Sequence, residues 1–319
     1  MNTHLQKIIE HLQTPSTSIL TLHRNPDGDS IGSNLALYEV LKSFRHTVHI
    51  YSNDPVPQYL QFLPSTKEII TRRPSENGWN NYKLYWALDM RDAKMIGDTF
   101  TFPESLKIIS IDHHITENDW GNIWYRDSSA ISTTILLYRI FLEAQIDITP
   151  DIATCLLTGL ATDSGFFSHA KSSEPFTVTA KLIDLGARYE EITTNIQKNM
   201  DFRDIQFISY ALGKAQIFED KKALIIAIPY EDWIMYVNED DKSSLLKRYI
   251  QSINGTDVGI TIIEKSPKKF RISFRSRNPE YDVNQVASKI GGGGHKNASG
   301  AYIEANSVEN AIQIILNLL

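Results

Sequence analysis

The stretch SILTLHRNPDGDSIGSNLALYEVLKSF, residues 18–44, joins an apolar run to a helical pattern through a turn crowded with charge. SILTLH (18–23) predicts a β-strand, and the apolar spacing of SIGSNLALYEVLKSF (30–44) predicts a helix. Between them, His23, Asp27 and Asp29 lie within seven residues. Like charges this close repel one another and lose hydration when buried, so the pattern indicates that a cation binds there.

Length and composition indicate an ordinary globular chain. At 319 residues the chain is too long for one compact core, so two domains are expected. The single cysteine, Cys155, excludes an internal disulfide and a Cys-rich zinc site. MNTHLQKIIEHLQ (1–13) predicts an amphipathic helix rather than a signal peptide, and every apolar run is far shorter than the roughly 18 residues that span a bilayer. We therefore expect a cytoplasmic protein with no membrane partner.

The charge is unevenly distributed along the chain. A net charge of −6 argues against a protein that coats nucleic acid along its whole surface. EKSPKKFRISFRSR (264–277) nevertheless contains six basic residues and one acid. This run fits a solvated hairpin face, and it also fits a surface that meets an anionic ligand.

The first half of the sequence alternates between strand and helix patterns. Strand-like runs at 47–52, 82–89 and 106–112 precede helical patterns at 132–144 and 152–165. This alternation predicts an α/β domain with a parallel, Rossmann-like sheet flanked by helices.

In the second half of the sequence, strand patterns predominate after a polar helical segment. Three β-rich runs follow it, KALIIAIP (222–229), VGITIIE (258–264) and FRISFRSR (270–277), and then a helical pattern at 283–290 leads into the glycine loop GGGGH (291–295). The predicted organisation is a domain of residues 1–189, a helical linker of residues 190–214 and a smaller α/β domain of residues 215–319 with a mixed sheet.

Four clusters of acids and histidines mark the first domain: HRNPDGD (23–29), LDMRD (88–92), DHH (112–114) and TDSG (162–165). Three follow a predicted strand, and the fourth lies where an apolar helix turns. Because loops at the carboxyl ends of parallel strands meet in one crevice, we expect the clusters to converge. Oxygen and nitrogen ligands without thiolate suit Mn²⁺, Mg²⁺ or Fe²⁺, and two ions roughly 3.5–4 Å apart need about this many ligands. The residues expected to meet are His23, Asp27, Asp29, Asp89, His113 and Asp163.

Each cluster alone also fits a structural role. Aspartate after a strand commonly caps a helix, and DGD is a common turn. Ser132 and Thr133 are expected to cap a helix, although a cap beside the crevice would also reach a phosphate. Cys155 lies in an apolar helical run, where an inert buried thiol is expected.

Taken together, the motifs resemble a known family. NPDGDSIGS (25–33), LDMRD, DHH and GLATDSG (159–165), followed by FRSR (274–277) and GGGGHKNASG (291–300), are similar to the DHH phosphoesterase superfamily and specifically to its DHH–DHHA1 branch. The motifs occur in the family's order over essentially the whole chain. The resemblance implies a hydrolase of phosphoric ester bonds that releases 5′-mononucleotides from very short single-stranded RNA. It also implies removal of the 3′-phosphate of 3′-phosphoadenosine 5′-phosphate (PAP).

The resemblance implies roles for individual residues. His23 and Asp27 match ligands of one divalent ion, Asp29, His113 and Asp163 match ligands of a second, and Asp89 matches the carboxylate shared between them. Mn²⁺ is the preferred assignment, with Mg²⁺ or Fe²⁺ as alternatives. His114 matches the residue that faces the scissile phosphate, and Asp112 matches a carboxylate that orients the site. The residues matching the nucleotide-binding set of the second domain are Arg275, Gly292, Gly293, Gly294 and His295.

Alternative functions stay open on the sequence. A linear dinucleotide phosphodiesterase that hydrolyses pApA after cyclic-di-AMP opening would use the same groups. A family II pyrophosphatase shares the first-domain motifs, but the glycine-rich second domain argues against it. A non-catalytic nucleotide- or RNA-binding module would keep the fold without turnover. The amphipathic N-terminal helix fits packing on its own domain, and it also leaves a homodimer open.

Overall fold

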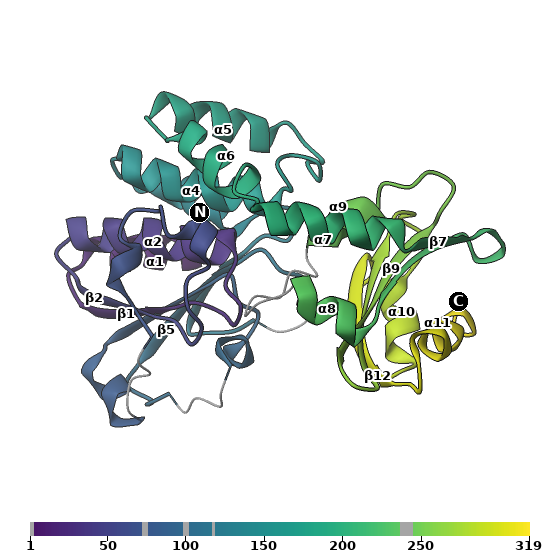
Figure 1. Ribbon diagram of the computed structural model, residues 1–319. Coiled ribbons are helices and arrows are strands. Elements are labelled where there is room, and N and C mark those ends of the chain that lie inside the picture. The colour runs from purple at the N-terminus through teal and green to yellow at the C-terminus, as the bar shows by residue number, and fades with distance from the viewer. Residues whose placement is uncertain (1–2, 72–75, 98–101, 117–118, 237–244) are drawn as a thin grey trace. The chain divides into compact units, whose positions relative to one another are not determined.

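The chain folds into two compact units, Met1–Asn199 and Met200–Leu319 (Figure 1). In the computed structural model, the described residues are 3–71, 76–97, 102–116, 119–236 and 245–319. The segment for which a helical linker was expected, residues 190–214, contributes one helix to each unit, and a break in helix at residues 198–201 separates the two.

The first unit is built on a parallel sheet of six strands in the order β3-β2-β1-β4-β5-β6. The predicted Rossmann-like α/β arrangement is therefore confirmed. Its strands are β1 (Thr17–Thr21), β2 (Thr47–Tyr51), β3 (Ile69–Ile70), β4 (Leu84–Leu88), β5 (Lys107–Asp112) and β6 (Ile123–Arg126).

Helices of the first unit begin where the sequence offers a capping side chain. Asp27 caps α2, Ser132 caps α3 and Thr149 caps α4, each by accepting a backbone N–H of the first turn. Figure 1 shows α1, α2 and α4 on the same side of the sheet. The helices are α1 (Thr3–Gln13), α2 (Gly28–Ser43), α3 (Thr133–Glu143), α4 (Pro150–Asp163), α5 (Glu174–Asp184) and α6 (Tyr189–Gln197).

The two faces of this sheet are packed by different elements. Leu20 and Trp86 lie in the core that contains the helices, and Ile8 and Leu12 of α1 are fully buried in that same core. Their strand neighbours point the other way, as period-two alternation requires, into a second core that includes Trp79. The apolar face of α1 is thus used within its own unit.

The second unit has a mixed sheet in the order β11-β12-β10-β9-β8-β7, in which β8 and β9 are parallel and the other neighbours antiparallel. The predicted mixed sheet is confirmed. Its strands are β7 (Ala215–Phe218), β8 (Ala223–Ile228), β9 (Val258–Ser266), β10 (Lys269–Ser276), β11 (Gly293–His295) and β12 (Ala298–Glu304). Its helices are α7 (Phe202–Gly213), α8 (Tyr230–Tyr236), α9 (Lys247–Ile250), α10 (Val283–Ser288) and α11 (Val308–Leu316).

The tetraglycine run is not only the loop expected from the sequence. Gly293–His295 forms the edge strand β11, which pairs with β12 through a hairpin whose last pair is His295 and Ala298. A Cβ on Gly294 would lie 2.5 Å from the carbonyl oxygen of Ala298, so glycine lets the two strands approach. The physical reason for the difference is that pairing to β12 satisfies backbone groups that a loop would leave to water.

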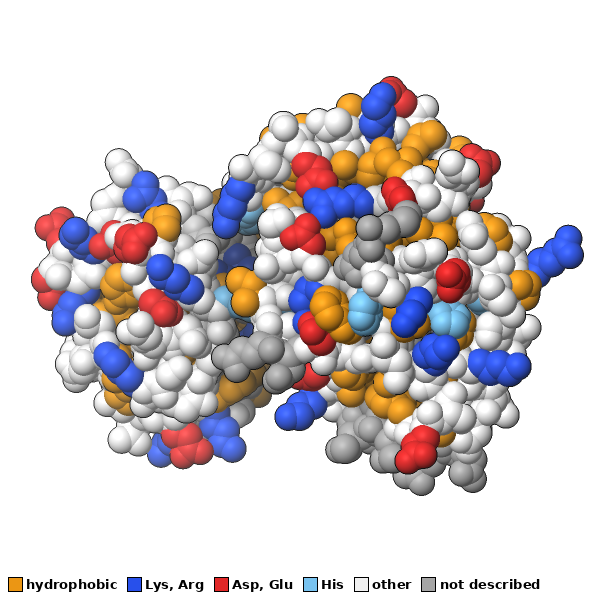
Figure 2. Space-filling view, turned by 180° about the vertical axis from the view of Figure 1, so that it is seen from behind, with side chains coloured by type: hydrophobic (Ala, Val, Ile, Leu, Met, Phe, Trp, Pro, Cys, Tyr) orange, Lys and Arg blue, Asp and Glu red, His pale blue; other side chains and the backbone are white. Residues whose placement is uncertain are grey.

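The surface carries mixed charge. On the face seen in Figure 2, lysine and arginine side chains lie among aspartate and glutamate side chains rather than in one patch of a single sign. This agrees with the small net charge of −6. Among the described residues, no helix combines the length and the apolar character needed to cross a membrane.

Close approach of α2 and α4 generates a prediction for stability. A Cβ on Gly32 would lie 2.4 Å from the carbonyl oxygen of Cys155, a backbone atom that cannot yield without moving α4. We expect Gly32→Ala to lower the free energy of unfolding by roughly 1–3 kcal/mol. Denaturant unfolding followed by circular dichroism measures this change.

Gly213→Ala is the matched control, because Gly213 also lies in a helix but a Cβ added there would have no atom within 4 Å. This variant should leave stability unchanged or raise it by up to about 1 kcal/mol. Equal effects at the two positions would contradict the packing argument.

Candidate active site

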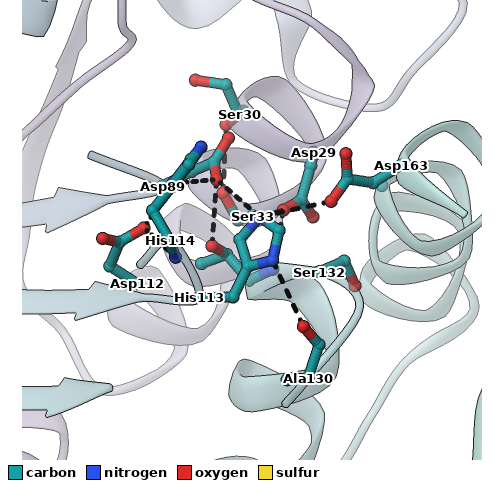
Figure 3. A network of polar contacts seen from close by, with 12 residues as sticks. Asp29, Ser30, Ser33, Asp89, Asp112, His113, His114, Ala130, Ser132 and Asp163 are labelled. Carbon is teal, nitrogen blue, oxygen red and sulfur yellow. Dashed lines mark hydrogen bonds and ion pairs between the residues drawn. The ribbon is translucent and has the colours of Figure 1, made fainter. Parts of the chain in front are cut away.

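The acidic and histidine clusters of the first unit come together at one edge of its sheet (Figure 3). Each lies at or just beyond the carboxyl end of a strand, or at the last residue of α4. Three groups have ligand atoms that all lie within 4.8 Å of one another, and Asp89 and His113 each belong to two of them. The groups are His23, Asp27 and Asp89; Asp29, His113 and Asp163; and Asp89, His113 and His114.

Asp27 caps a helix and also lies beside His23, a candidate metal ligand. Its Oδ1 accepts the backbone N–H groups of Asp29 and Ser30, each at 3.1 Å, and so caps α2. The same oxygen lies 3.8 Å from Nε2 of His23. The Asp27 side chain is 57% exposed whereas Asp89 is 4% exposed, so Asp27 forms the open side of the group.

Backbone carbonyls fix the orientation of two imidazoles. Nδ1 of His23 lies 2.8 Å from the carbonyl oxygen of Arg24, and Nδ1 of His113 lies 3.3 Å from that of Ala130. A carbonyl only accepts hydrogen bonds, so Nδ1 carries a proton in both rings. Nε2 therefore faces the carboxylates in both, the arrangement that metal-binding histidines commonly adopt.

The amino end of α3 holds Asp29 in place. Oδ2 of Asp29 accepts the backbone N–H of Thr133 at 2.6 Å, while Oδ1 accepts the backbone N–H and the hydroxyl of Thr134 at 3.1 and 2.9 Å. The partial positive charge of a helix amino terminus favours a carboxylate at this position. A Cβ on Gly159 would lie 2.7 Å from Oδ1 of Asp29, so α4 can pass this close only with glycine there.

Asp89 lies between His23 and His113. Its backbone adopts the left-handed conformation, with φ of 59°, directly after β4. Such strained conformations are uncommon outside glycine and occur often at functional sites. Its carboxylate is 3.4 Å from Nε2 of His23 and 3.5 Å from Nε2 of His113, and Oδ1 accepts the hydroxyl of Thr133 at 3.1 Å.

The carboxylates and imidazoles shift one another's protonation. Burial opposes the charged form of both histidines, but Asp27 and Asp89 raise the pKa of His23 to about 10, and Asp89, with neighbouring carboxylates, raises the pKa of His113 to about 10. Burial, reinforced by the charge of Asp89, raises the pKa of Asp163 to about 7 in spite of the opposing effect of His113.

The pKa values of Asp29 and Asp89 shift in opposite directions. Burial and the charges of Asp89 and Asp163 raise the pKa of Asp29 well above its ordinary value. Burial acts the same way on Asp89, but its bonds to His113 and His23 outweigh burial and lower its pKa. The site thus holds more negative charge than it can stabilise by itself, which is the condition under which cations bind.

His114 lies near Asp89, as His113 does, but its closest partner is Asp112. Its Nδ1 lies 2.7 Å from Oδ1 of Asp112, and its backbone N–H donates to the same oxygen at 3.2 Å. Asp112 is fully buried, and the His114 side chain is 24% exposed. The carboxylate therefore sets the orientation of an imidazole that solvent or a substrate can reach.

The donor set fits hard or intermediate divalent cations. Carboxylate oxygens and imidazole nitrogens converge without a thiolate, because the one cysteine, Cys155, is buried in α4 away from these groups, where burial raises its pKa. The close, buried carboxylates have more mutual repulsion than the histidines offset. A dication between them relieves this repulsion directly.

Four of the five predicted nucleotide-binding residues border one hollow on the second unit. Arg271, Ser273 and Arg275 alternate with the buried residues Phe270, Ile272 and Phe274 along β10, so they share the face opposite the core. They border a hollow of about 640 Å³ with Gly291, Gly292, Gly293 and His295. Burial and the neighbouring Arg271 lower the pKa of Arg275. Gly294 is the one predicted residue that does not border this hollow.

Comparison with known proteins agrees with the geometry. Residues 18–160 match the model of the DHH family, N-terminal domain, and residues 233–319 match that of the DHHA1 domain. The bifunctional oligoribonuclease and PAP phosphatase NrnA of Thermus thermophilus is 30% identical over 302 residues, covering 93% of this chain and 87% of that protein. This chain belongs to the DHH–DHHA1 phosphoesterase family. It is accordingly a hydrolase of phosphoric ester bonds.

A second relative is similar in sequence, and two solved structures share the fold. NrnA of Bacillus subtilis is 24% identical, covering 93% of this chain and 92% of its own. The crystal structure of an exopolyphosphatase-related protein from Bacteroides fragilis superposes with a TM-score of 0.91 at 22% identity, covering 100% of this chain and 96% of that one. The structure of the exonuclease RecJ bound to manganese shares the fold with a TM-score of 0.52 at 12% identity, covering 98% and 93% of the two chains.

Sequence reasoning missed several residues that support the site. The sequence predicts a helix cap at Thr133, and contact with a phosphate if the cap lies beside the crevice, but it does not predict the hydrogen bonds of Thr133 and Thr134 to Asp29 or the role of Gly159. Ser132, Thr133 and Thr134 precede an apolar run and so indicate a helix amino terminus. Tertiary packing decides which carboxylate accepts hydrogen bonds from that terminus, and the local sequence does not show it. Gly159 gave no local signal, since its role is the close approach of Asp29 to α4.

The repulsion among these carboxylates predicts how Asp163→Asn changes the melting temperature. Asp163→Asn removes a charge whose burial and repulsion destabilise the metal-free protein, so we expect its melting temperature without metal to rise at pH 8. Added Mn²⁺ should stabilise the original chain by mass action and stabilise this variant much less. Calorimetry with EDTA and with excess Mn²⁺ measures both shifts.

Asp147→Asn is the matched control, because Asp147 is an exposed aspartate of the same unit outside the site. It should keep the full response to Mn²⁺. The account of the site would be contradicted if Asp163→Asn and Asp147→Asn responded alike.

Proposed function

We propose that this chain is a two-metal phosphodiesterase that degrades very short single-stranded RNA to 5′-mononucleotides. The same site would remove the 3′-phosphate of PAP to give AMP. The observation that supports the proposal most is the convergence of four carboxylates and two imidazoles at one sheet edge. The names of the NrnA relatives supply the substrate class.

Each proposed ion has its own set of ligands. His23 and Asp27 would hold one ion, Asp29, His113 and Asp163 would hold the other, and Asp89 would contact both. The position of Asp89 in contact with Nε2 of both histidines supports its shared role. Mn²⁺ is the proposed metal, since it accepts this mixture of oxygen and nitrogen ligands, and Mg²⁺ or Fe²⁺ would suit the same set.

Hydrolysis breaks the bond between phosphorus and the leaving oxygen as water adds to phosphorus. Bound divalent cations supply an activated water and neutralise charge on the phosphoryl oxygens. His114, with Nδ1 donating to Asp112, would direct Nε2 at the phosphate or at the leaving oxygen and supply a proton there. Asp29, held by the amino end of α3, would keep its ligand oxygen in one place during turnover.

The second unit would bind the substrate by its anionic and nucleotide parts. Arg275 presents a planar fork suited to a phosphate, and the glycines lining the hollow let backbone N–H groups approach an anion. The hollow, about 640 Å³, is large enough for a nucleotide. The names of the NrnA relatives support a short RNA or a nucleotide as the partner.

Asp89→Asn tests the shared ligand. Removing this charge should lower kcat by more than roughly 100-fold, since losing even an outer partner of a metal ligand costs about 10–100-fold. Binding of a fluorescent RNA dinucleotide should persist, because the binding groups lie in the second unit. Turnover at the original rate would refute the metal assignment.

Graded substrates test the proposed activity. We expect 5′-labelled RNAs of about two to five nucleotides, the lengths that the family resemblance implies, to give mononucleotides only with added Mn²⁺, and longer RNAs to react more slowly. Including pApA and PAP in the same series separates an oligoribonuclease and PAP phosphatase from a dinucleotide-specific enzyme. Binding without hydrolysis of any of them would favour a non-catalytic module.

Arg275→Met tests the hollow of the second unit. Loss of a charged hydrogen bond to phosphate should raise KM for a dinucleotide roughly tenfold or more and change kcat less. Arg277→Met is the matched control, since Arg277 is an exposed arginine of the same segment that does not line the hollow. An equal rise in KM for both variants would contradict a specific role of Arg275.

A further inference from the structure

Arg126 lies beside Asp112, the carboxylate that contacts the candidate catalytic residue His114. It is the last residue of β6, and it pairs in register with Asp112 at the end of β5. Because paired residues of neighbouring strands place their side chains on the same side of the sheet, the guanidinium lies beside the Asp112 carboxylate, with Nε 3.7 Å from Oδ2. The Arg126 side chain is 10% exposed and that of Asp112 is fully buried.

The two oxygens of Asp112 have different partners. Oδ1 accepts both the backbone N–H and Nδ1–H of His114. Oδ2 accepts no hydrogen bond from the described residues and faces the guanidinium of Arg126. A fully buried carboxylate is costly without a cation nearby, and Arg126 supplies that cation on the side away from His114.

A second carboxylate limits the movement of the arginine. Nη1 of Arg126 donates to Oδ1 of Asp119 at 3.0 Å. Asp119 is 50% exposed, so the guanidinium is held between a buried acid and a surface acid. A planar guanidinium between two carboxylates resists rotation more than a lysine ammonium does.

We propose that Arg126 is a positioning residue for hydrolysis. It holds the Asp112 carboxylate at the angle at which Oδ1 aligns the ring of His114, so that Nδ1–H stays directed at Oδ1 and Nε2 at the phosphate. The inference rests on the proposed function, because it assigns Arg126 an effect through the residue that faces the phosphate. A small rotation of a catalytic group away from its productive angle lowers turnover, while substrate binding in the second unit is unaffected.

Arg126→Met and Arg126→Lys test the proposal. Methionine keeps much of the length of the side chain without its charge, and lysine keeps the charge without the planar fork. With saturating Mn²⁺ and an RNA dinucleotide, we expect Arg126→Met to lower kcat roughly 10–100-fold with KM little changed. Arg126→Lys should recover part of that loss.

A variant that lacks the catalytic ring separates positioning from a general loss of stability. In the His114→Ala background, Arg126→Met should lower kcat no further, since the ring that it orients is absent. Arg188→Met is the matched control, because Arg188 also bridges two carboxylates in the first unit, at 2.6 and 2.8 Å, away from the site. It should lower stability at most and leave kcat unchanged.

Two results would overturn the inference. One is an unchanged kcat in Arg126→Met, and the other is an equal fall in kcat with and without His114. If Arg126→Met shows no cooperative unfolding, Arg126→Lys takes its place in both backgrounds with the same criteria. Absence of turnover by the unmodified chain on every nucleotide substrate would instead refute the proposed function, so the two failures are distinct.

Discussion

Repulsion among buried carboxylates is the constraint on which this structure depends. Asp29 and Asp89 are almost completely buried, and Asp163 lies with them around a single imidazole, His113. The imidazoles of His23 and His113 offset this charge only in part, as the raised pKa values of Asp29 and Asp163 show. Removing one of these charges, as in Asp163→Asn, is expected to stabilise the metal-free chain, so the crowding itself indicates function rather than stability. The proposed dications account for them.

The fold supplies what such a site needs without placing its residues close together in sequence. Parallel strands deliver three clusters to one edge, and α4 brings the fourth to it. The amino end of α3 fixes Asp29, and backbone carbonyls fix the rings of His23 and His113. Rigid elements rather than side-chain contacts alone therefore hold the candidate ligands, which is the preorganisation that the proposed phosphoryl chemistry requires.

The sequence predicted the parts of the fold that carry a strong local pattern. The long apolar strands β1, β4 and β5 and the helix α2 follow from periodicity, and the meeting of their terminal acids follows from parallel topology. Short edge strands such as β3, with only Ile69 and Ile70, carry too little pattern to be predicted. Contacts made by tertiary packing were also out of reach: nothing near Thr134 or Gly159 in sequence indicates that Asp29 lies against them. Roles of single ligands came from family resemblance and stay predictions.

The central claim is that the acids of the first unit enclose a pair of divalent cations. Anomalous diffraction at the manganese edge, from crystals grown with Mn²⁺, tests it most directly. The account predicts two peaks roughly 3.5–4 Å apart, one beside His23 and Asp27, the other beside Asp29, His113 and Asp163, with Asp89 contacting both. A single peak, or none at this sheet edge, would contradict it.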